Sequence, residues 1–175
     1  MRQLLLLLMV LLVASCTTPR STPSTILDGP LAERLAQRDL KLGDPVFIRI
    51  FKEESLLELW MERSNGHYLH FANYPICNYS GTLGPKFYEG DKQAPEGFYR
   101  VTRQMLNPNS RYYKSFDLGF PNSFDRAHQR TGSYLMVHGD CVSVGCYAMR
   151  DDQIDEIYRL VESALRAGQP YVEVH

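Results

Sequence analysis

The chain of 175 residues carries 19 Lys and Arg residues against 20 Asp and Glu residues, which gives a formal net charge of −1 at pH 7. This balance lacks the basic excess with which proteins neutralise nucleic-acid phosphates, so we expect no nucleic-acid partner. The length suits a single domain with a sizeable hydrophobic core.

The first residues have the pattern of an export signal. Arg2 supplies a basic start, an apolar run covers residues 4–13, and small residues precede Cys16. The run is shorter than the ~20 residues that span a bilayer, so a cleaved signal over residues 1–15 explains it better than a transmembrane helix. The ending resembles the bacterial lipobox, which implies that Cys16 is lipid-modified. The absence of Asp at Thr17 then favours a periplasmic protein anchored to the outer membrane. The alternative is an ordinary cleaved signal in which Cys16 is incidental.

The segment after the signal is expected to connect the anchor to the domain. Residues 16–25 are rich in Ser, Thr and Pro and have no apolar period, which is typical of a tether. Residues 26–44 are expected to form a surface helix that runs to about Leu42, with Leu31 and Leu35 on one face.

The remainder of the chain, residues 45–175, has mainly the pattern of short strands. Alternating residues 57–62 predict a strand with Trp60 in the core, and Asn65-Gly66 is a strong hairpin signal. An amphipathic helix is expected from Asp151 to about Gly168. The expected strands are 46–52, 57–62, 67–71, 74–79, 98–103, 112–118, 133–137 and 171–174. Together these elements predict a strand-rich α+β domain with one helix packed on it.

Three other segments have weaker signals. The glycine-rich residues 80–97 lack the Gly-Lys-Ser/Thr ending of a phosphate-binding loop, so we expect an ordinary loop. Residues 121–128 are expected to form a loop with at most one helical turn, in which His128 either lines a cleft or makes local hydrogen bonds. The tripeptide Tyr112–Lys114 is expected either to contact a peptide substrate or to pack within a strand.

The cysteines restrict the possible covalent links. Free thiols tend to pair in the oxidising compartments that exported proteins reach. If Cys16 is lipidated, Cys77, Cys141 and Cys146 remain of the four cysteines, and at least one of them is unpaired. If the unpaired one is Cys146, the only possible disulfide joins Cys77 and Cys141.

The stretch from His138 to Cys146 concentrates reactive groups. A thiol attacks as the thiolate, and a neighbouring imidazole can take its proton and return it to a leaving amine. Gly139 allows close backbone packing beside the histidine, and Gly145 allows a substrate carbonyl to approach Cys146. Backbone N–H groups around Cys146 can form an oxyanion hole. The residues therefore predict an acyl-transfer site.

Three alternatives remain open from the residues alone. Cys146 can be a buried, inert cysteine. Cys141 can be the nucleophile, although it lies only three residues from His138. His138, Cys141 and Cys146, with or without Cys77, can form a zinc site. The exported context and the lack of a Cys-x-x-Cys pair argue against thiolate zinc, so we expect no metal.

A resemblance identifies the chemistry more closely. His138-Gly139, followed by Ser143-x-Gly145-Cys146, resembles the signature of the L,D-transpeptidase catalytic domain, the YkuD-like family. Further stretches resemble its YafK-type branch, namely residues 79–86, 89–91, 95–97, 111–114, 119–122, 125–128 and 168–170. The match runs in order from about Pro45 to the end of the chain.

This resemblance implies a YkuD-like β-sandwich-type domain with a packed C-terminal helix. It implies an enzyme without a cofactor that attacks a peptide bond at meso-diaminopimelate in peptidoglycan stem peptides. Cys146 would be the nucleophile and His138 the proton donor and acceptor, with the Gly139 carbonyl orienting the imidazole. Ser143 and Gly145 would lie in the substrate site.

The resemblance also implies a direction for the reaction. The YafK-type branch is associated with hydrolysis that releases lipoprotein from the cell wall. The alternatives are a transpeptidase that crosslinks stem peptides or attaches lipoprotein, and a non-catalytic wall-binding lipoprotein. Much of the wider family has an arginine two residues after the cysteine, where this chain has Ala148. This departure weakens the inference from crosslinking enzymes and favours the hydrolytic branch.

Overall fold

The computed structural model describes residues 30–175. The expected signal over residues 1–15, Cys16 and the tether over residues 16–25 therefore lie outside the described residues, and their predictions stay predictions. Between residues 30 and 175, no helix is long and apolar enough to cross a membrane.

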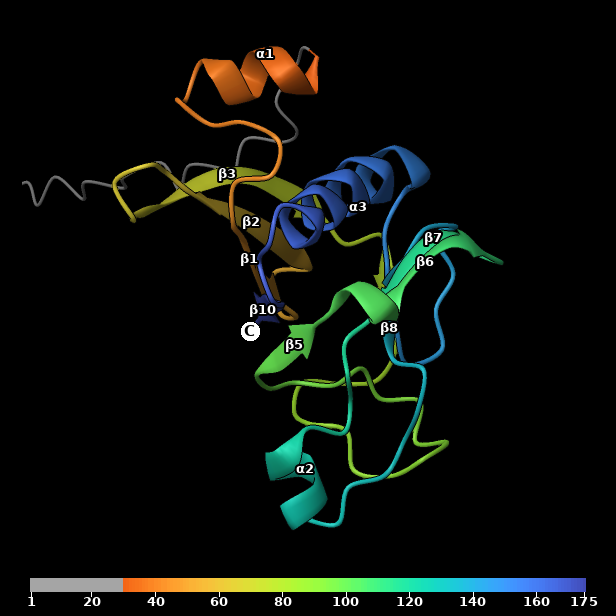
Figure 1. Ribbon diagram of the computed structural model, residues 1–175. Helices are drawn as coiled ribbons and strands as arrows, with labels where there is room; N and C mark the ends of the chain where they lie inside the picture. Colours follow the sequence, from red (N-terminus) through yellow and green to blue (C-terminus); the bar gives the residue numbers. More distant parts are fainter. Residues whose placement is uncertain (1–29) are drawn as a thin grey trace, which may run out of the picture.

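Two five-stranded sheets form the body of the domain (Figure 1). The first sheet has the strand order β3-β2-β1-β10-β5. Its members are β1 (Val46–Phe51), β2 (Leu56–Glu62), β3 (Tyr68–Pro75), β5 (Tyr99–Val101) and β10 (Val172–Val174). Only β1 and β10 pair in parallel in this sheet; its other pairs are antiparallel.

The second sheet has the strand order β4-β9-β8-β7-β6. Its members are β4 (Asn78–Tyr79), β6 (Leu106–Ser110), β7 (Tyr113–Asp117), β8 (Met136–His138) and β9 (Tyr147–Ala148). Its parallel pair is β8 with β9, and the strands around that pair are antiparallel. The two sheets confirm the strand-rich α+β class predicted from the sequence.

Four helical segments complete the fold. They are α1 (Leu31–Ala36), the 3₁₀ turn η1 (Arg103–Met105), α2 (Ser123–Ala127) and α3 (Asp151–Arg166). The amphipathic helix α3 contacts β1 of the first sheet and β7 of the second, whereas α2 lies at the opposite end of the domain (Figure 1). Ile154, Ile157 and Val161, spaced as on one helix face, are fully buried.

The alternation of β2 explains why the expectation for Trp60 is wrong. Leu57, Leu59 and Met61 are fully buried, and a strand points successive side chains to opposite faces. Trp60 therefore faces away from the core, where it lines a cleft of about 970 Å³ on the outer side of the first sheet.

Helix α1 ends earlier than the expected Leu42. The chain turns through Asp39, which has a φ of 55°, and the Leu40 amide donates to the Leu35 carbonyl at 3.0 Å. This bond closes the helix end in the manner of a Schellman turn, and it places both leucines in the core. The helix lies at the surface as expected, although Arg34 on it is buried and paired with Glu156 of α3.

Candidate active site

The parallel pair β8–β9 brings His138 and Cys146 into one region. Val137 is paired with Tyr147, and His138 is paired with Ala148. Cys146 directly precedes β9, and the Met136 amide donates to its Sγ at 3.4 Å. His138 lies two residues after Met136 in β8, a distance of about 7 Å along a strand. The candidate nucleophile and the candidate base therefore lie on neighbouring strands.

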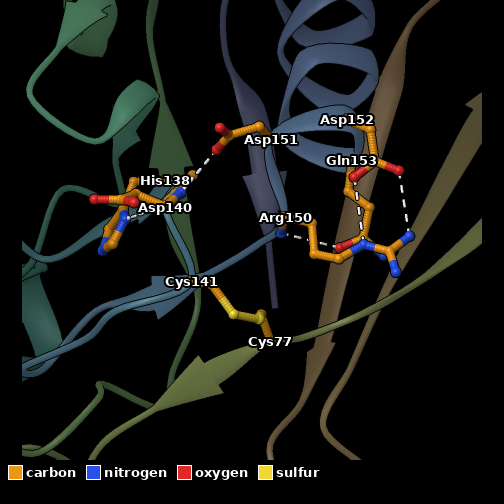
Figure 2. The surroundings of a disulfide bond; sticks show 9 residues. Cys77, His138, Asp140, Cys141, Arg150, Asp151, Asp152 and Gln153 are labelled. Carbon is orange, nitrogen blue, oxygen red and sulfur yellow. Dashed lines mark hydrogen bonds and ion pairs between the residues drawn. A yellow bond between two sulfur atoms is a disulfide. The ribbon is translucent and has the colours of Figure 1, made fainter.

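The His138 imidazole is buried and held in its neutral form. The residue is 1% exposed, and its Nδ1 lies 2.6 Å from the Gly139 carbonyl oxygen (Figure 2). A carbonyl only accepts, so Nδ1 carries the proton and Nε2 is left to accept another. Burial lowers the pKa of His138 from its ordinary value of 6.5, although the Gly139 carbonyl and Asp140 oppose the shift. The imidazole is therefore uncharged at neutral pH.

Gly139 is required by the packing around it. A Cβ at this position would lie 2.6 Å from Asp151 Oδ1 and 2.9 Å from the Tyr112 carbonyl oxygen. The same carboxylate accepts from the Asp140 amide at 2.9 Å (Figure 2). The start of α3 and the turn before β7 thus close directly on the residue after His138, as the sequence predicts for a glycine here.

Cys146 is a protected thiol. The residue is 8% exposed, and Sγ donates to the Tyr134 carbonyl oxygen at 3.6 Å. Burial raises the pKa of Cys146 above its ordinary value, and the Met136 amide only partly offsets that effect. Within residues 30–175, no hydrogen bond joins Cys146 and His138. Proton transfer therefore requires the Sγ–H group to turn from Tyr134 toward the imidazole.

Two serine hydroxyls hold the backbone around the thiol. The Ser143 hydroxyl accepts from the Cys146 amide at 3.1 Å and donates to the Cys146 carbonyl at 2.6 Å. The Gly145 amide, at a φ of 93°, donates to the Ser80 hydroxyl. The N–H groups predicted to form an oxyanion hole are therefore engaged by hydroxyls in this structure. The sequence pattern does not single out Ser80, because it lies far from Gly145 in the chain.

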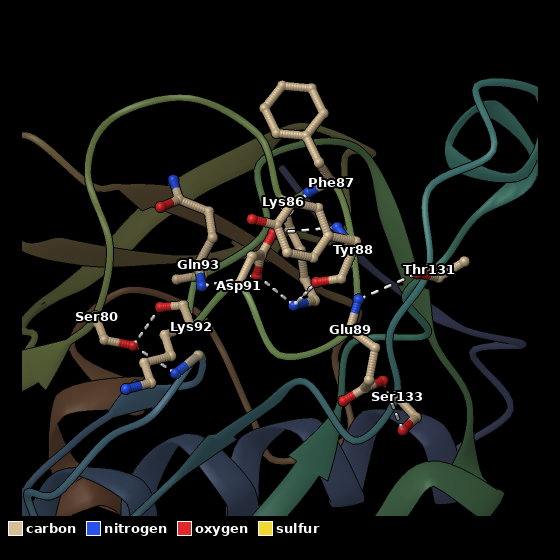
Figure 3. A network of polar contacts seen from close by, with 12 residues as sticks. Ser80, Lys86, Phe87, Tyr88, Glu89, Asp91, Lys92, Gln93, Thr131 and Ser133 are labelled. Atoms are coloured by element: carbon tan, nitrogen blue, oxygen red, sulfur yellow. Dashed lines mark hydrogen bonds and ion pairs between the residues drawn. The ribbon is translucent and has the colours of Figure 1, made fainter.

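The glycine-rich loop, residues 80–97, is held by internal hydrogen bonds and contacts the thiol region through Ser80. Lys86 is buried and donates to Asp91 Oδ1 at 2.6 Å and to the Tyr88 carbonyl at 2.9 Å (Figure 3). Burial opposes ionisation of Asp91, but hydrogen bonds from Lys86 and backbone amides lower its pKa to about 2. The Ser80 hydroxyl donates to the Lys92 carbonyl at 2.6 Å. Lys86 is thus bound within the loop, as expected of loop chemistry rather than a phosphate site.

A disulfide joins Cys77 to Cys141, with the two Cα atoms 5.3 Å apart (Figure 2). It connects the segment before β4 to the turn after His138, and the Cys77 amide also donates to the Ala148 carbonyl at 2.8 Å. The pairing expected from cysteine counting is therefore present. Cys146 is the free cysteine of the described region. Because the sulfurs of Cys77 and Cys141 are bonded to each other, Cys141 cannot act as the nucleophile and the two cannot bind zinc as thiolates.

Removing the disulfide tests its contribution to stability. The bond closes a loop with a sequence separation of 64 residues. The Cys77→Ser/Cys141→Ser double variant is expected to lose about 4 kcal/mol of unfolding free energy, because its unfolded chain regains loop entropy. Urea unfolding of the two proteins measures the difference, with Cys146→Ser as a control that leaves the bond intact. Equal midpoints and slopes would contradict this expectation.

The other candidate residues lie in different surroundings. His128 is exposed, and its Nδ1 contacts the Phe124 carbonyl at 2.9 Å, which matches the expectation of local hydrogen bonds. Lys114 pairs with Asp155 of α3. Tyr112 lies in the turn between β6 and β7, not in the predicted strand, and its ring packs on the His138 ring with 4.7 Å between centroids.

Position 148 has no space for the arginine common in the wider family. The Ala148 side chain is fully buried beside His138 in the sheet. Arg150 is exposed and donates to the Asp152 carboxylate (Figure 2). In this structure Arg150 therefore does not take the place of the missing arginine.

Comparisons with known proteins identify the family of the chain. The family model of the L,D-transpeptidase catalytic domain, YkuD, matches residues 45–170. The chain is 47% identical over 174 residues to "Putative L,D-transpeptidase YafK" of Escherichia coli strain K12 and of strain O157:H7, covering 99% of this chain and 70% of each relative.

Solved structures support the fold. The helical cell shape determining protein Pgp2 of Campylobacter jejuni is 21% identical, with a TM-score of 0.57 over 81% of this chain and 53% of that chain. Bd1075 of Bdellovibrio bacteriovorus is 22% identical, with a TM-score of 0.50 over 75% of this chain and 46% of that chain. The chain thus spans about half the length of these structures. From the family match and the relative's identity together, the chain belongs to the YkuD family of L,D-transpeptidase catalytic domains.

Proposed function

We propose that the protein is a cysteine acyl-transfer enzyme that opens a peptide bond at meso-diaminopimelate in peptidoglycan and passes the acyl group to water. The observation that carries this proposal is the free thiol of Cys146 beside His138, whose Nδ1 is tied to the Gly139 carbonyl. Family membership supplies the peptidoglycan substrate class.

The reaction has two proposed stages. In the first, His138 Nε2 takes the Cys146 proton while Sγ bonds to the substrate carbonyl carbon. The carbon–nitrogen bond then breaks, and the imidazolium returns its proton to the leaving amine, which leaves a thioester on Cys146. In the second, His138 takes a proton from water, the hydroxide bonds to the thioester carbon, the carbon–sulfur bond breaks, and the imidazolium returns its proton to Sγ. The products are a free carboxylic acid and the restored thiol.

The family departure favours water as the acceptor. Ala148 separates this chain from much of the crosslinking family. A crosslinking or lipoprotein-attaching transpeptidase is the second candidate, because the relative is named a putative L,D-transpeptidase. The released group is proposed to be wall-bound lipoprotein.

One incubation separates these activities. Purified protein is mixed with sacculi that carry bound lipoprotein and, separately, with tetrapeptide-rich sacculi, each beside Cys146→Ala. Free lipoprotein in the first mixture supports the hydrolase, whereas new diaminopimelate–diaminopimelate links in the second support the transpeptidase. Saturable binding without product would favour a wall-binding lipoprotein. Equal product from Cys146→Ala would overturn the proposal.

The proposed location is the periplasm, through a lipid on Cys16 in the outer membrane. The apolar run before Cys16 and the small residues beside it support this proposal. When cells that express the protein grow with a labelled fatty acid, the wild-type protein is expected to carry the label and its Cys16→Ser variant is not. Label retained by that variant would contradict lipidation at Cys16.

The acid side of the pH profile follows from the lowered pKa of His138. Because burial lowers the pKa of His138 from 6.5, the base stays neutral until the pH falls below this lowered pKa. The rate kcat/KM is therefore expected to be flat through neutrality and to decline about tenfold per pH unit below the His138 pKa. A series of sacculus digestions from pH 4 to pH 8 measures it. An acid limb centred above pH 7 would contradict the neutral, buried base.

A further inference from the structure

The turn between β6 and β7 is attached to the backbone beside His138. The Gly139 amide donates to the Tyr112 carbonyl at 3.0 Å and to the Lys114 carbonyl at 3.2 Å. In the same sheet, Ser115 of β7 is paired with His138 of β8. These contacts fix the position of Tyr112 relative to the imidazole independently of the Tyr112 side chain.

The Tyr112 ring then covers a face of the imidazole. The centroids of the two rings are 4.7 Å apart, and their planes differ by 31°. The Tyr112 hydroxyl accepts from the exposed Arg111 guanidinium, which also lies 4.8 Å from the centre of the Tyr112 ring. The hydroxyl is therefore engaged away from His138, and the ring face is the part of Tyr112 that contacts the base.

We propose that Tyr112 is a positioning residue, whose ring holds the His138 imidazole so that Nε2 faces the thiol, with Arg111 fixing the ring. The hydrogen bond to Gly139 fixes Nδ1 alone, and the Tyr112 ring also restricts the plane of the imidazole. The electron-rich face of a tyrosine ring also attracts the imidazolium that forms when His138 holds the Cys146 proton. This inference rests on the proposed role of His138 as the base.

The test uses readouts that need no peptidoglycan. Tyr112→Leu removes the ring, and Tyr112→Phe keeps it without the hydroxyl. Tyr171→Leu is the matched control, because Tyr171 also carries a stacked arginine, Arg100, but directly precedes β10 of the first sheet. For each protein we would measure the rate of Cys146 alkylation by iodoacetamide at pH 7 and the ¹⁵N shifts of the His138 ring.

The ring contact predicts distinct results for these variants. Tyr112→Leu is expected to slow alkylation about tenfold, the upper range of one aromatic contact. Its His138 nitrogens should show a mixture of tautomers, whereas wild type and Tyr112→Phe show Nδ1–H alone. Tyr171→Leu should match wild type. Wild-type alkylation and tautomer signals in folded Tyr112→Leu would overturn the inference.

Arg111→Gln decides the question if Tyr112→Leu does not fold, because Arg111 is exposed and outside the core. It is expected to slow alkylation about twofold and to broaden the His138 signals, since the loss of one surface contact is a small effect. Unchanged signals would overturn the inference. A wild-type protein that alkylates normally but leaves sacculi intact would instead contradict the proposed function, so the two failures are distinguishable.

Discussion

Cys146→Ala is expected to lower the release of product from sacculi by at least about 10⁴-fold, the scale on which loss of a catalytic nucleophile acts. The physical reason is that no other described cysteine has a free thiol, since Cys77 and Cys141 are bonded to each other. Chromatography of the released peptides at equal protein concentration measures the effect.

Cys146→Ser is the matched control for this loss. Serine keeps the size of the side chain and a hydrogen-bond donor for the Tyr134 carbonyl, but it is a far weaker nucleophile in a cysteine site. Both variants should unfold near the wild-type midpoint, because the disulfide and the buried strands are untouched. Folded Cys146→Ala that still releases product at the wild-type rate would exclude Cys146 as the nucleophile.

His138→Gln is expected to reduce kcat about 10²- to 10⁴-fold, the usual contribution of a general acid and base. The glutamine amide can still donate to the Gly139 carbonyl, as Nδ1 does at 2.6 Å, but it cannot accept the thiol proton. Steady-state digestion rates between pH 5 and pH 9 measure the change, and the acid limb assigned to His138 should be absent from the residual rate.

His128→Gln provides the comparison for this histidine. His128 is exposed and bonded locally to Phe124, so the same chemical change there should leave kcat and the acid limb as in wild type. If His138→Gln kept more than about a tenth of the wild-type kcat, a general-base role would be contradicted.

Much of the fold could be predicted from local pattern. The alternation in β2 and the 3.6-residue period of α3 reflect which faces are buried, and both elements lie where the sequence places them. The Asn65-Gly66 turn joins β2 to β3, with Gly66 at a φ of 78°. The Cys77–Cys141 pairing could be predicted by elimination once Cys16 was assumed to be lipidated and Cys146 to be free.

Other features depend on contacts that a linear pattern does not contain. The face of β2 that carries Trp60 is determined by which side α3 covers. The stack of Tyr112 on His138 needs β7 paired with β8, and the Ser80–Gly145 contact needs β4 paired with β9. The sequence places Tyr112 either in contact with a peptide substrate or within a strand, and neither expectation includes a contact with His138. The resting bond from Cys146 to Tyr134 likewise follows from tertiary packing.

The central claim is that Cys146 forms a thioester with a peptidoglycan stem peptide, and the mass of that adduct tests it most directly. The protein is mixed briefly with peptidoglycan fragments, quenched in acid, digested and analysed by mass spectrometry. A diaminopimelate-containing peptide should be bound to the Cys146 fragment and be released by hydroxylamine, with no adduct on Cys146→Ala. Turnover without this adduct, or an adduct that persists on Cys146→Ala, would contradict the mechanism.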